Sequence, residues 1–218
     1  MANTSRPFGF RPVRYQDSSA WNGQTQLYGF SASQANNVYK GDVVAIDTTN
    51  RATALTDAYA PQIPVLKPLV AAMTTTVFRG IVAGFVPQPE FVQTATASLG
   101  TTYRVLSTAR YGWIVDDATV IFEVEEAGTN SYTSSSSNGV NKGIDIVYTA
   151  GNTTHGLAAV KVDGGTVGIT QLPFRLLRNT QKVDNFSYAS TDSVSKIHWD
   201  VMMMNSDLGS TGVVTVGA

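Results

Sequence analysis

The sequence predicts an all-β protein: a single β-barrel or β-sandwich domain between an extended N-terminal arm and a C-terminal β extension. Two observations indicate this fold class. Short runs of β-branched and aromatic residues recur along the chain and are bounded by Gly, Pro and Asp-Gly turns. Apolar residues at the helical spacing are scarce, and no solenoid or propeller repeat is visible. The expected boundaries are 1–38 for the arm, 39–170 for the β domain and 171–218 for the extension.

The N-terminal arm is rich in rings and arginines but sustains neither the helical nor the strand period over its first 28 residues. Pro7 and Pro12 favour extended backbone at the residues before them. Rings that cannot be buried locally must pack elsewhere, either on the arm's own domain or on a neighbouring subunit. We expect the neighbouring subunit, which would make this an assembly protein. The candidate partner-binding residues are Phe8, Phe10, Arg11, Arg14, Tyr15 and Trp21.

The β domain is expected to contain a series of short strands. Their ranges are 41–47, 76–85, 101–106, 112–115, 119–126 and 143–149. Gly80 and Gly84 in the second run indicate a bulge or a close approach of two backbones. The Ser-rich stretch 128–139 has the composition of a loop.

The end of the β domain is expected to form a hairpin. Residues 158–162 would pair with 166–170 across Asp163, Gly164 and Gly165, because Asp-Gly tolerates positive φ. The C-terminal extension then carries the segment 172–177 and a strand at 195–203. Two weak helix candidates remain, at 88–99 and 66–76. β-branched residues weaken the first, and prolines interrupt the start of the second.

Composition excludes several classes of function. A net charge of -1 and a pI near 6.1 argue against general nucleic-acid binding, which needs a strong positive field. The absence of cysteine removes disulfides, thiol catalysis and the usual structural zinc sites. No apolar run approaches the ~20 residues of a membrane span, and we expect no secretion signal.

Catalytic equipment is sparse. His155 is expected in an exposed turn, and His198 on the strand face opposite Ile197 and Trp199. No nucleophile elbow, phosphate-binding loop, zinc-protease motif or dinucleotide fingerprint is present. We therefore expect no enzymatic activity and no cofactor.

The acidic residues allow a metal site or carboxylate catalysis as alternatives. Asp116 and Asp117 precede the run 119–126, in which Glu123, Glu125 and Glu126 follow. Such a group could bind calcium or supply the two carboxylates of glycoside hydrolysis. The Asp pair is nevertheless typical of a turn. Glu123 and Glu125 alternate with apolar residues, so we expect them on a solvated strand face.

Five segments carry a resemblance to a known group of proteins. They are 7–13 (PFGFRPV), 22–26 (NGQTQ), 41–44 (GDVV), 115–125 (VDDATVIFEVE) and 172–177 (LPFRLL). The chain resembles tailed-bacteriophage virion structural proteins, in which an extended PFGFRPV arm leads into a GD-V strand. Members of that group often have proline after the Asp pair, where this chain has Ala118. The matching segments are spread over most of the chain, but each is short and none is a chemical signature.

The resemblance implies a head decoration (cement) protein on the outside of the capsid. Its partner would be the major capsid protein, with a homotrimer as the assembled form, no specific nucleic acid and no membrane, and the virion as its location. An alternative is a carbohydrate- or host-binding β module of the neck, tail or fibre, with Trp21, Trp113 and Trp199 as stacking platforms. A glycan-active enzyme is a third possibility, and it requires two acids that converge on one pocket.

Overall fold

The computed structural model describes residues 7–49, 63–70, 77–86, 102–127, 140–168, 172–180 and 197–207. These residues form eleven strands and no helix, so the expected all-β class is confirmed for the described part of the chain. The strands are β1 (Arg11–Tyr15), β2 (Gln26–Phe30), β3 (Val43–Ile46), β4 (Val65–Pro68), β5 (Gly80–Phe85), β6 (Arg110–Val115), β7 (Val120–Ala127), β8 (Gly143–Val147), β9 (Lys161–Gly168), β10 (Phe174–Asn179) and β11 (His198–Met203).

Five strands close into a barrel in the order β2-β4-β3-β5-β6. Strand β6 completes the circuit by pairing with both β5 and β2 in antiparallel fashion. Side chains that point inward fill the barrel, as expected for such a small circuit. They are Tyr28, Phe30, Val38, Val44, Leu66, Val82 and Ile114.

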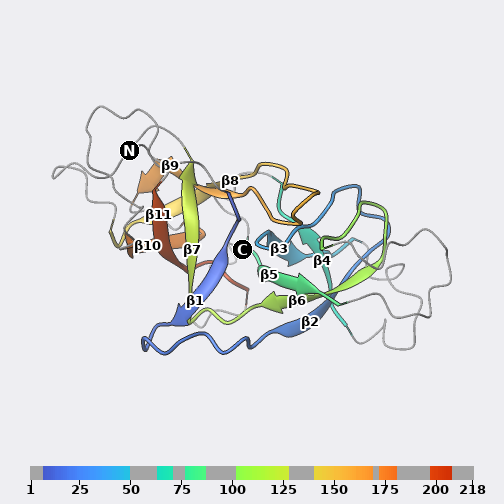
Figure 1. The fold of residues 1–218 in the computed structure, drawn as a ribbon, viewed down its shortest axis with the longest axis horizontal. Helices are drawn as coiled ribbons and strands as arrows, with labels where there is room; N and C mark the ends of the chain where they lie inside the picture. The colour runs from blue at the N-terminus through green and yellow to red at the C-terminus, as the bar shows by residue number, and fades with distance from the viewer. Residues whose placement is uncertain are drawn as a thin grey trace, which may run out of the picture.

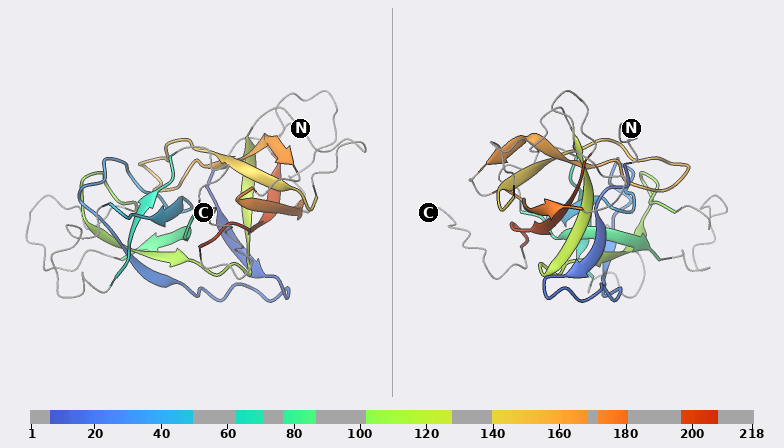
Figure 2. Two further views of the ribbon diagram at one scale, coloured as in Figure 1. Left: turned by 180° about the vertical axis from the view of Figure 1, so that it is seen from behind. Right: turned by 60° about the vertical axis from the view of Figure 1, so that its left-hand side comes forward.

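The other six strands form a second sheet in the order β1-β7-β11-β10-β8-β9. Strand β7 has eight residues and pairs along one edge with two strands: β1 lies against its first half and β9 against its end. The β7–β9 pairing links the last strand of the order back to β7. A second closed circuit therefore contains five of these strands (β7, β11, β10, β8 and β9), and β1 pairs with β7 outside it. The two groups of strands lie side by side (Figures 1 and 2).

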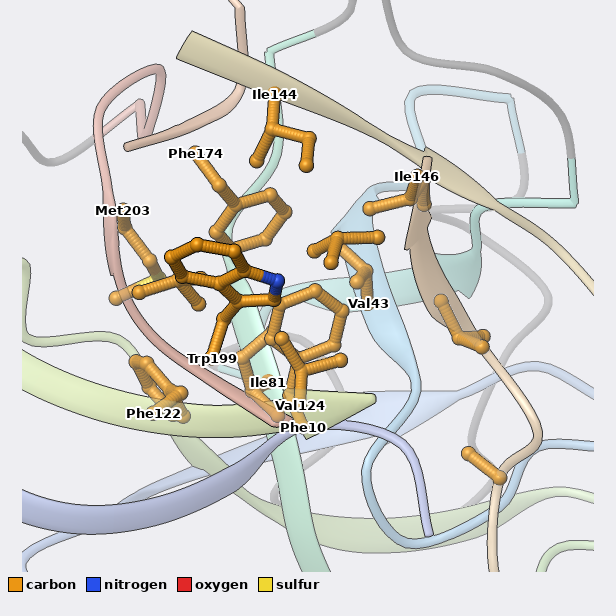
Figure 3. Close-up of a cluster of buried hydrophobic side chains, with 14 of the residues drawn as sticks. Phe10, Val43, Ile81, Phe122, Val124, Ile144, Ile146, Phe174, Trp199 and Met203 are labelled. Atoms are coloured by element: carbon orange, nitrogen blue, oxygen red, sulfur yellow. The ribbon is translucent and has the colours of Figure 1, made fainter. Parts of the chain in front are cut away.

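One large apolar cluster joins the two sheets. In β3, β5 and β6 one residue points into the barrel while its neighbour points toward the second sheet; Val44 and Val43 form such a pair. These strands are thus buried on both faces, which explains their nearly continuous apolar sequences. Phe10, Phe122, Phe174 and Trp199 meet Val43 and Ile81 in this shared core (Figure 3).

The predicted strand at 101–106 is wrong. Only Arg104 forms an isolated bridge there, with Val38, and its side chain is fully buried. Its guanidinium donates hydrogen bonds to the carbonyl oxygens of Ser31, Gln34, Asn36 and Thr108. Burial lowers the pKa of Arg104 to about 10. The segment around Arg104 is therefore held by hydrogen bonds from one side chain to several backbone carbonyls, and not by strand pairing.

The predicted hairpin across Asp163 is also wrong, because β9 runs without interruption from Lys161 to Gly168. It pairs antiparallel with β8 and parallel with the end of β7. Asp163 instead makes a local hydrogen bond within the strand, in which its carboxylate accepts the Gly165 N–H at 2.9 Å. The helix candidate 66–76 is wrong where it is described, since β4 lies there, and candidate 88–99 and the loop 128–139 lie outside the described residues.

Candidate partner-binding surface

The N-terminal segment, beginning at its first described residue Pro7, packs on its own chain. Phe10 is 2% exposed and stacks on Phe174 with ring centroids 4.5 Å apart. Its backbone N–H donates to the Gly41 carbonyl at 2.9 Å. Gly9 and Gly41 both have positive φ, and their backbones pass so closely that neither position has room for a Cβ. Phe10 is thus a core residue rather than a surface contact.

Phe8 and Arg11 lie on the outer face of the second sheet, which is the face opposite the shared core. The Phe8 ring packs edge-on against His198 at 5.3 Å, and the Arg11 guanidinium lies over the same ring at 4.9 Å. Arg11 also forms an ion pair with Glu123 and keeps 51% of its side chain exposed. This part of the predicted site is available to a partner.

Of the other three predicted residues, Arg14 and Tyr15 end β1 and Trp21 lies in the loop after it. Arg14 forms an ion pair with Asp200 at 3.1 Å. The Tyr15 hydroxyl donates to Asn22 at 2.7 Å, so the tyrosine fastens the loop that follows β1. Trp21 packs partly against the core, and its indole N–H is buried without an acceptor among the described residues. Packing on the own domain therefore holds for Phe10, while contact with a neighbouring subunit stays a prediction for the exposed Arg11.

The expectation of a solvated face for Glu123 and Glu125 is wrong, because each is 1% exposed. Cationic groups from neighbouring strands cover the two carboxylates. Glu123 pairs with Arg11 from β1, and Glu125 pairs with Lys161 from β9 at 2.6 Å. The His198 ring lies between them, with Nδ1 3.1 Å from Glu123 and Nε2 4.0 Å from Glu125. A buried carboxylate needs such partners.

The strand registers place four of these charges in one row across the sheet. Arg11 of β1 is opposite Glu123 of β7, Glu123 is opposite Asp200 of β11, and Asp200 is opposite Arg178 of β10. Directly opposed carboxylates repel one another. The arginines at both ends of the row offset this repulsion, and Arg178 reaches Asp200 at 2.8 Å.

A second row lies next to the first. Arg14 is opposite Ile121, Ile121 is opposite Met202, and Met202 is opposite Arg175. Residues that are directly opposed in antiparallel strands share a face, so all eight side chains of the two rows lie on the outer face. The arginines at the four ends are Arg11, Arg14, Arg175 and Arg178, which we call the arginine frame.

Two bulges create the arginine frame. In β1 the register shifts between Pro12 and Arg14, and in β10 it shifts between Leu176 and Arg178. In a regular strand, residues three positions apart point to opposite faces, but the extra residue of a bulge returns the second arginine to the first one's face. Sequence reasoning did not assign Arg175 and Arg178 to a site. The signal it missed is the Arg-x-x-Arg spacing shared by both strands.

Two buried carboxyl groups lie away from this face. Burial raises the pKa of Asp42 to about 7, although its carboxylate accepts the Tyr39 N–H at 2.7 Å. Burial also raises the pKa of Glu126 to about 7, against the lowering effect of its hydrogen bond from the Trp199 indole. One oxygen of each group has no partner among the described residues. Because both groups are almost fully buried, a substrate on the surface does not reach them.

The remaining candidates are dispersed. His155 lies in an exposed turn, as expected, and the Asp116–Asp117 turn connects β6 to β7. Of the three tryptophans considered as stacking platforms, Trp199 is buried, Trp21 is half-buried, and Trp113 on β6 is 40% exposed. Within the described ranges, no group of three acidic, histidine or cysteine side chains is arranged to hold a metal ion. The same part of the chain contains no helix that could cross a membrane.

No family model, no curated protein and no solved structure matches this chain.

Proposed function

We propose that this chain is a structural protein of a tailed-phage virion, and specifically a head decoration protein. In this role it would bind the outer face of the major capsid lattice as a homotrimer and stabilise the head through contacts between subunits. It would act without catalysis and without a cofactor. The proposal originates in the resemblance of the five sequence segments, and the arrangement of those segments supports it.

The carrying observation is that four of the five segments meet at Phe10. The ring of Phe10 from the first segment stacks on Phe174 from the last and packs edge-on against Phe122 at 6.4 Å. Its backbone bonds to Gly41 of the GD-V segment. Segments that are scattered in sequence but join in one core are the expected signature of a shared fold. The similar segments therefore contribute residues to the core, which favours a shared fold over chance matches.

The surface chemistry is also compatible with a protein that works by adhesion. The described outer face of the second sheet offers arginines, a phenylalanine and a methionine, which are enriched in protein–protein interfaces. Its carboxylates, Glu123 and Asp200, are buried and paired with arginines, whereas glycoside hydrolysis needs a carboxylic acid that reaches the substrate. Attachment fits this arrangement better than turnover does.

The test is to mix the purified chain with heads assembled from the same phage without this chain. Co-sedimentation at saturable stoichiometry, and a cryo-EM map with density for two five-stranded circuits on the outer capsid surface, are the expected results. Density at the neck or tail would contradict the decoration role while keeping the virion assignment. Absence of the chain from purified virions would refute both.

A carbohydrate- or host-binding module is the second candidate, and Trp113 is the observation that favours it. This ring is exposed on β6, opposite Gly84 of β5, where a Cβ would meet no atom within 4 Å. Open space beside an exposed indole suits stacking of a sugar ring. If this candidate is right, glycan-array binding should be saturable and should disappear in Trp113→Ala, with Trp21→Ala as the comparison.

A further inference from the structure

The arginine frame has unused hydrogen-bonding capacity. A guanidinium carries five N–H donors. Arg11 and Arg14 each use one terminal nitrogen to bind a carboxylate, and Arg178 uses Nε. Arg175 is exposed and makes no side-chain hydrogen bond or ion pair within the described part of the chain. Arg11 and Arg178 keep 51% and 55% of their side chains exposed. The remaining donors of Arg11, Arg175 and Arg178 are therefore largely open to solvent, whereas Arg14 keeps only 22% of its side chain exposed.

The buried carboxylates hold three of these arginines in place, namely Arg11, Arg14 and Arg178. Asp200 accepts hydrogen bonds from both Arg14 and Arg178, and it is itself buried. Arginines that are fixed in this way lose less side-chain entropy when they bind a ligand than free surface lysines do. Ion pairs with carboxylates beneath them also leave their outward N–H groups oriented for a second acceptor.

The geometry of the frame is set by the sheet. Its two ends lie three strand spacings apart, which is roughly 14 Å between backbones, and the two rows are separated by two residues, or roughly 7 Å. Between the arginines lie Ile121 and Met202 in one row and two carboxylates in the other. Ile121 is only 3% exposed, so the apolar contact available between the arginines is the half-buried Met202, a residue type enriched in interfaces together with arginine.

We propose that the arginine frame is a docking surface for an acidic segment of the protein to which this chain attaches. Charge complementarity identifies the occupant. Four guanidinium groups surround two carboxylates, so the frame has a net excess of two positive charges. Two charges are too few for a phosphate backbone, which is bound by neutralising many phosphates at once. They are sufficient for bidentate recognition of a few Asp or Glu side chains. In naming an attachment partner, this inference rests on the proposed function.

The first experiment measures binding of fluorescein-labelled decaglutamate to the full-length chain by anisotropy, with decaglutamine as the neutral probe. The test variant is Arg175→Gln combined with Arg178→Gln. The matched control is Lys40→Gln combined with Lys67→Gln, which removes the same two charges from the barrel side of the molecule. We expect the arginine variant to lose about tenfold or more in affinity, and the lysine variant to lose little.

A second variant protects the test against misfolding. Arg175→Glu leaves every observed ion pair of the two rows intact, because Arg175 forms none in the described structure. It should melt at the wild-type temperature and still weaken decaglutamate binding. Equal losses in the arginine and lysine variants would overturn the proposal, because the effect would then be general attraction. Tighter binding of a short DNA duplex than of decaglutamate would also overturn it.

The last experiment distinguishes this inference from the proposed function. Wild type and Arg175→Glu are compared for co-sedimentation with heads that lack this chain. Loss of head binding in Arg175→Glu supports both ideas. If wild type binds decaglutamate through the frame but not heads, the decoration role fails and the acidic-segment site stands. If Arg175→Glu binds heads as well as wild type does, the frame is not the attachment surface. A concentration-dependent dimer that Arg175→Glu abolishes would instead identify a second copy as the occupant and overturn the proposal.

Discussion

At the residue scale, Gly9 and Gly41 decide how the N-terminal segment enters the core. Gly9 has a φ of 69°, a region that L-residues with a Cβ adopt at a cost. A Cβ at Gly9 would also lie 2.6 Å from the Gly41 carbonyl oxygen, closer than real Cβ atoms come to backbone. This position therefore combines a conformational penalty with a steric one.

We predict that Gly9→Ala destabilises the protein more than Gly23→Ala does. Gly23 also has positive φ, at 88°, but a Cβ there would meet no atom within 4 Å. Gly23→Ala should cost about 1–2 kcal/mol from φ alone, and Gly9→Ala should cost more because the backbone of Gly41 cannot yield. Urea unfolding of both variants measures this. Equal costs would mean that the close approach contributes nothing.

The buried carboxyl of Asp42 gives a prediction of pH dependence. Its ordinary pKa is 3.8, and burial raises the pKa to about 7 in the folded protein. Between these values the folded state binds more protons than the unfolded state, so the free energy of unfolding falls as pH rises through this window and levels off above it. Ionised Asp42 thereby costs at most about 4 kcal/mol at the upper end.

Asp42→Asn should remove this pH dependence, because the amide oxygen still accepts the Tyr39 N–H and carries no charge. The variant should be more stable than wild type at pH 8, with the difference shrinking toward pH 4. Glu126→Gln should behave in the same direction. Urea unfolding at a series of pH values tests this, and parallel curves for wild type and variants would show that these carboxyl groups do not ionise at such cost.

At the element scale, β1 belongs to the second sheet. It pairs with the first half of β7, and the residue just before it, Phe10, is in the shared core. If the arm only contacted a partner, deletion of residues 1–23 would leave the domain folded. Because that deletion removes a strand and a core ring, the expectation is now a loss of cooperative folding.

The paired variants Phe10→Ala and Phe8→Ala separate the two roles within this segment. Phe10→Ala should cost about 3–5 kcal/mol, as for a buried phenylalanine. Phe8→Ala removes a half-buried ring from Arg11 and His198, so it should cost well under half of that. Denaturant midpoints measure both. Similar costs for the two would indicate that the segment does not pack as described.

At the scale of the whole molecule, the barrel and the second sheet share one apolar cluster. Val43, Ile81 and Val115 from the barrel strands contribute to it together with Phe122 and Trp199 from the second sheet. Neither group of strands can bury this face alone. If one group of strands unfolded, the apolar side chains of the other group would lose these contacts.

We therefore predict a single cooperative unfolding transition in calorimetry, with the calorimetric and van't Hoff enthalpies in agreement. Ile81→Ala should lower the midpoint without splitting the transition, because Ile81 is at the shared surface. Two resolved transitions in the wild type, or a split in the variant, would mean that the two groups of strands fold as separate units.

The sequence by itself determined the fold class and the position of most strands. Runs such as 41–47 and 119–126 contain enough β-branched and aromatic residues to specify extended structure locally, and β3 and β7 lie there. The Asp116–Asp117 turn and the bulge near Gly84 were predicted for the same reason, since both follow from local backbone preferences.

Only the tertiary structure decided what covers each strand face. Alternation shows that Glu123 and Phe122 point to opposite faces, but it does not show that arginines from β1 and β10 lie over the outer one. Bulges in those strands break the period of two. Arg11 and Arg14 therefore lie on the same face, although residues three positions apart in a regular strand point to opposite faces. Phe10 is buried for a similar reason: its partners, Gly41 and Phe174, are distant in sequence and meet it only once the strand order is set.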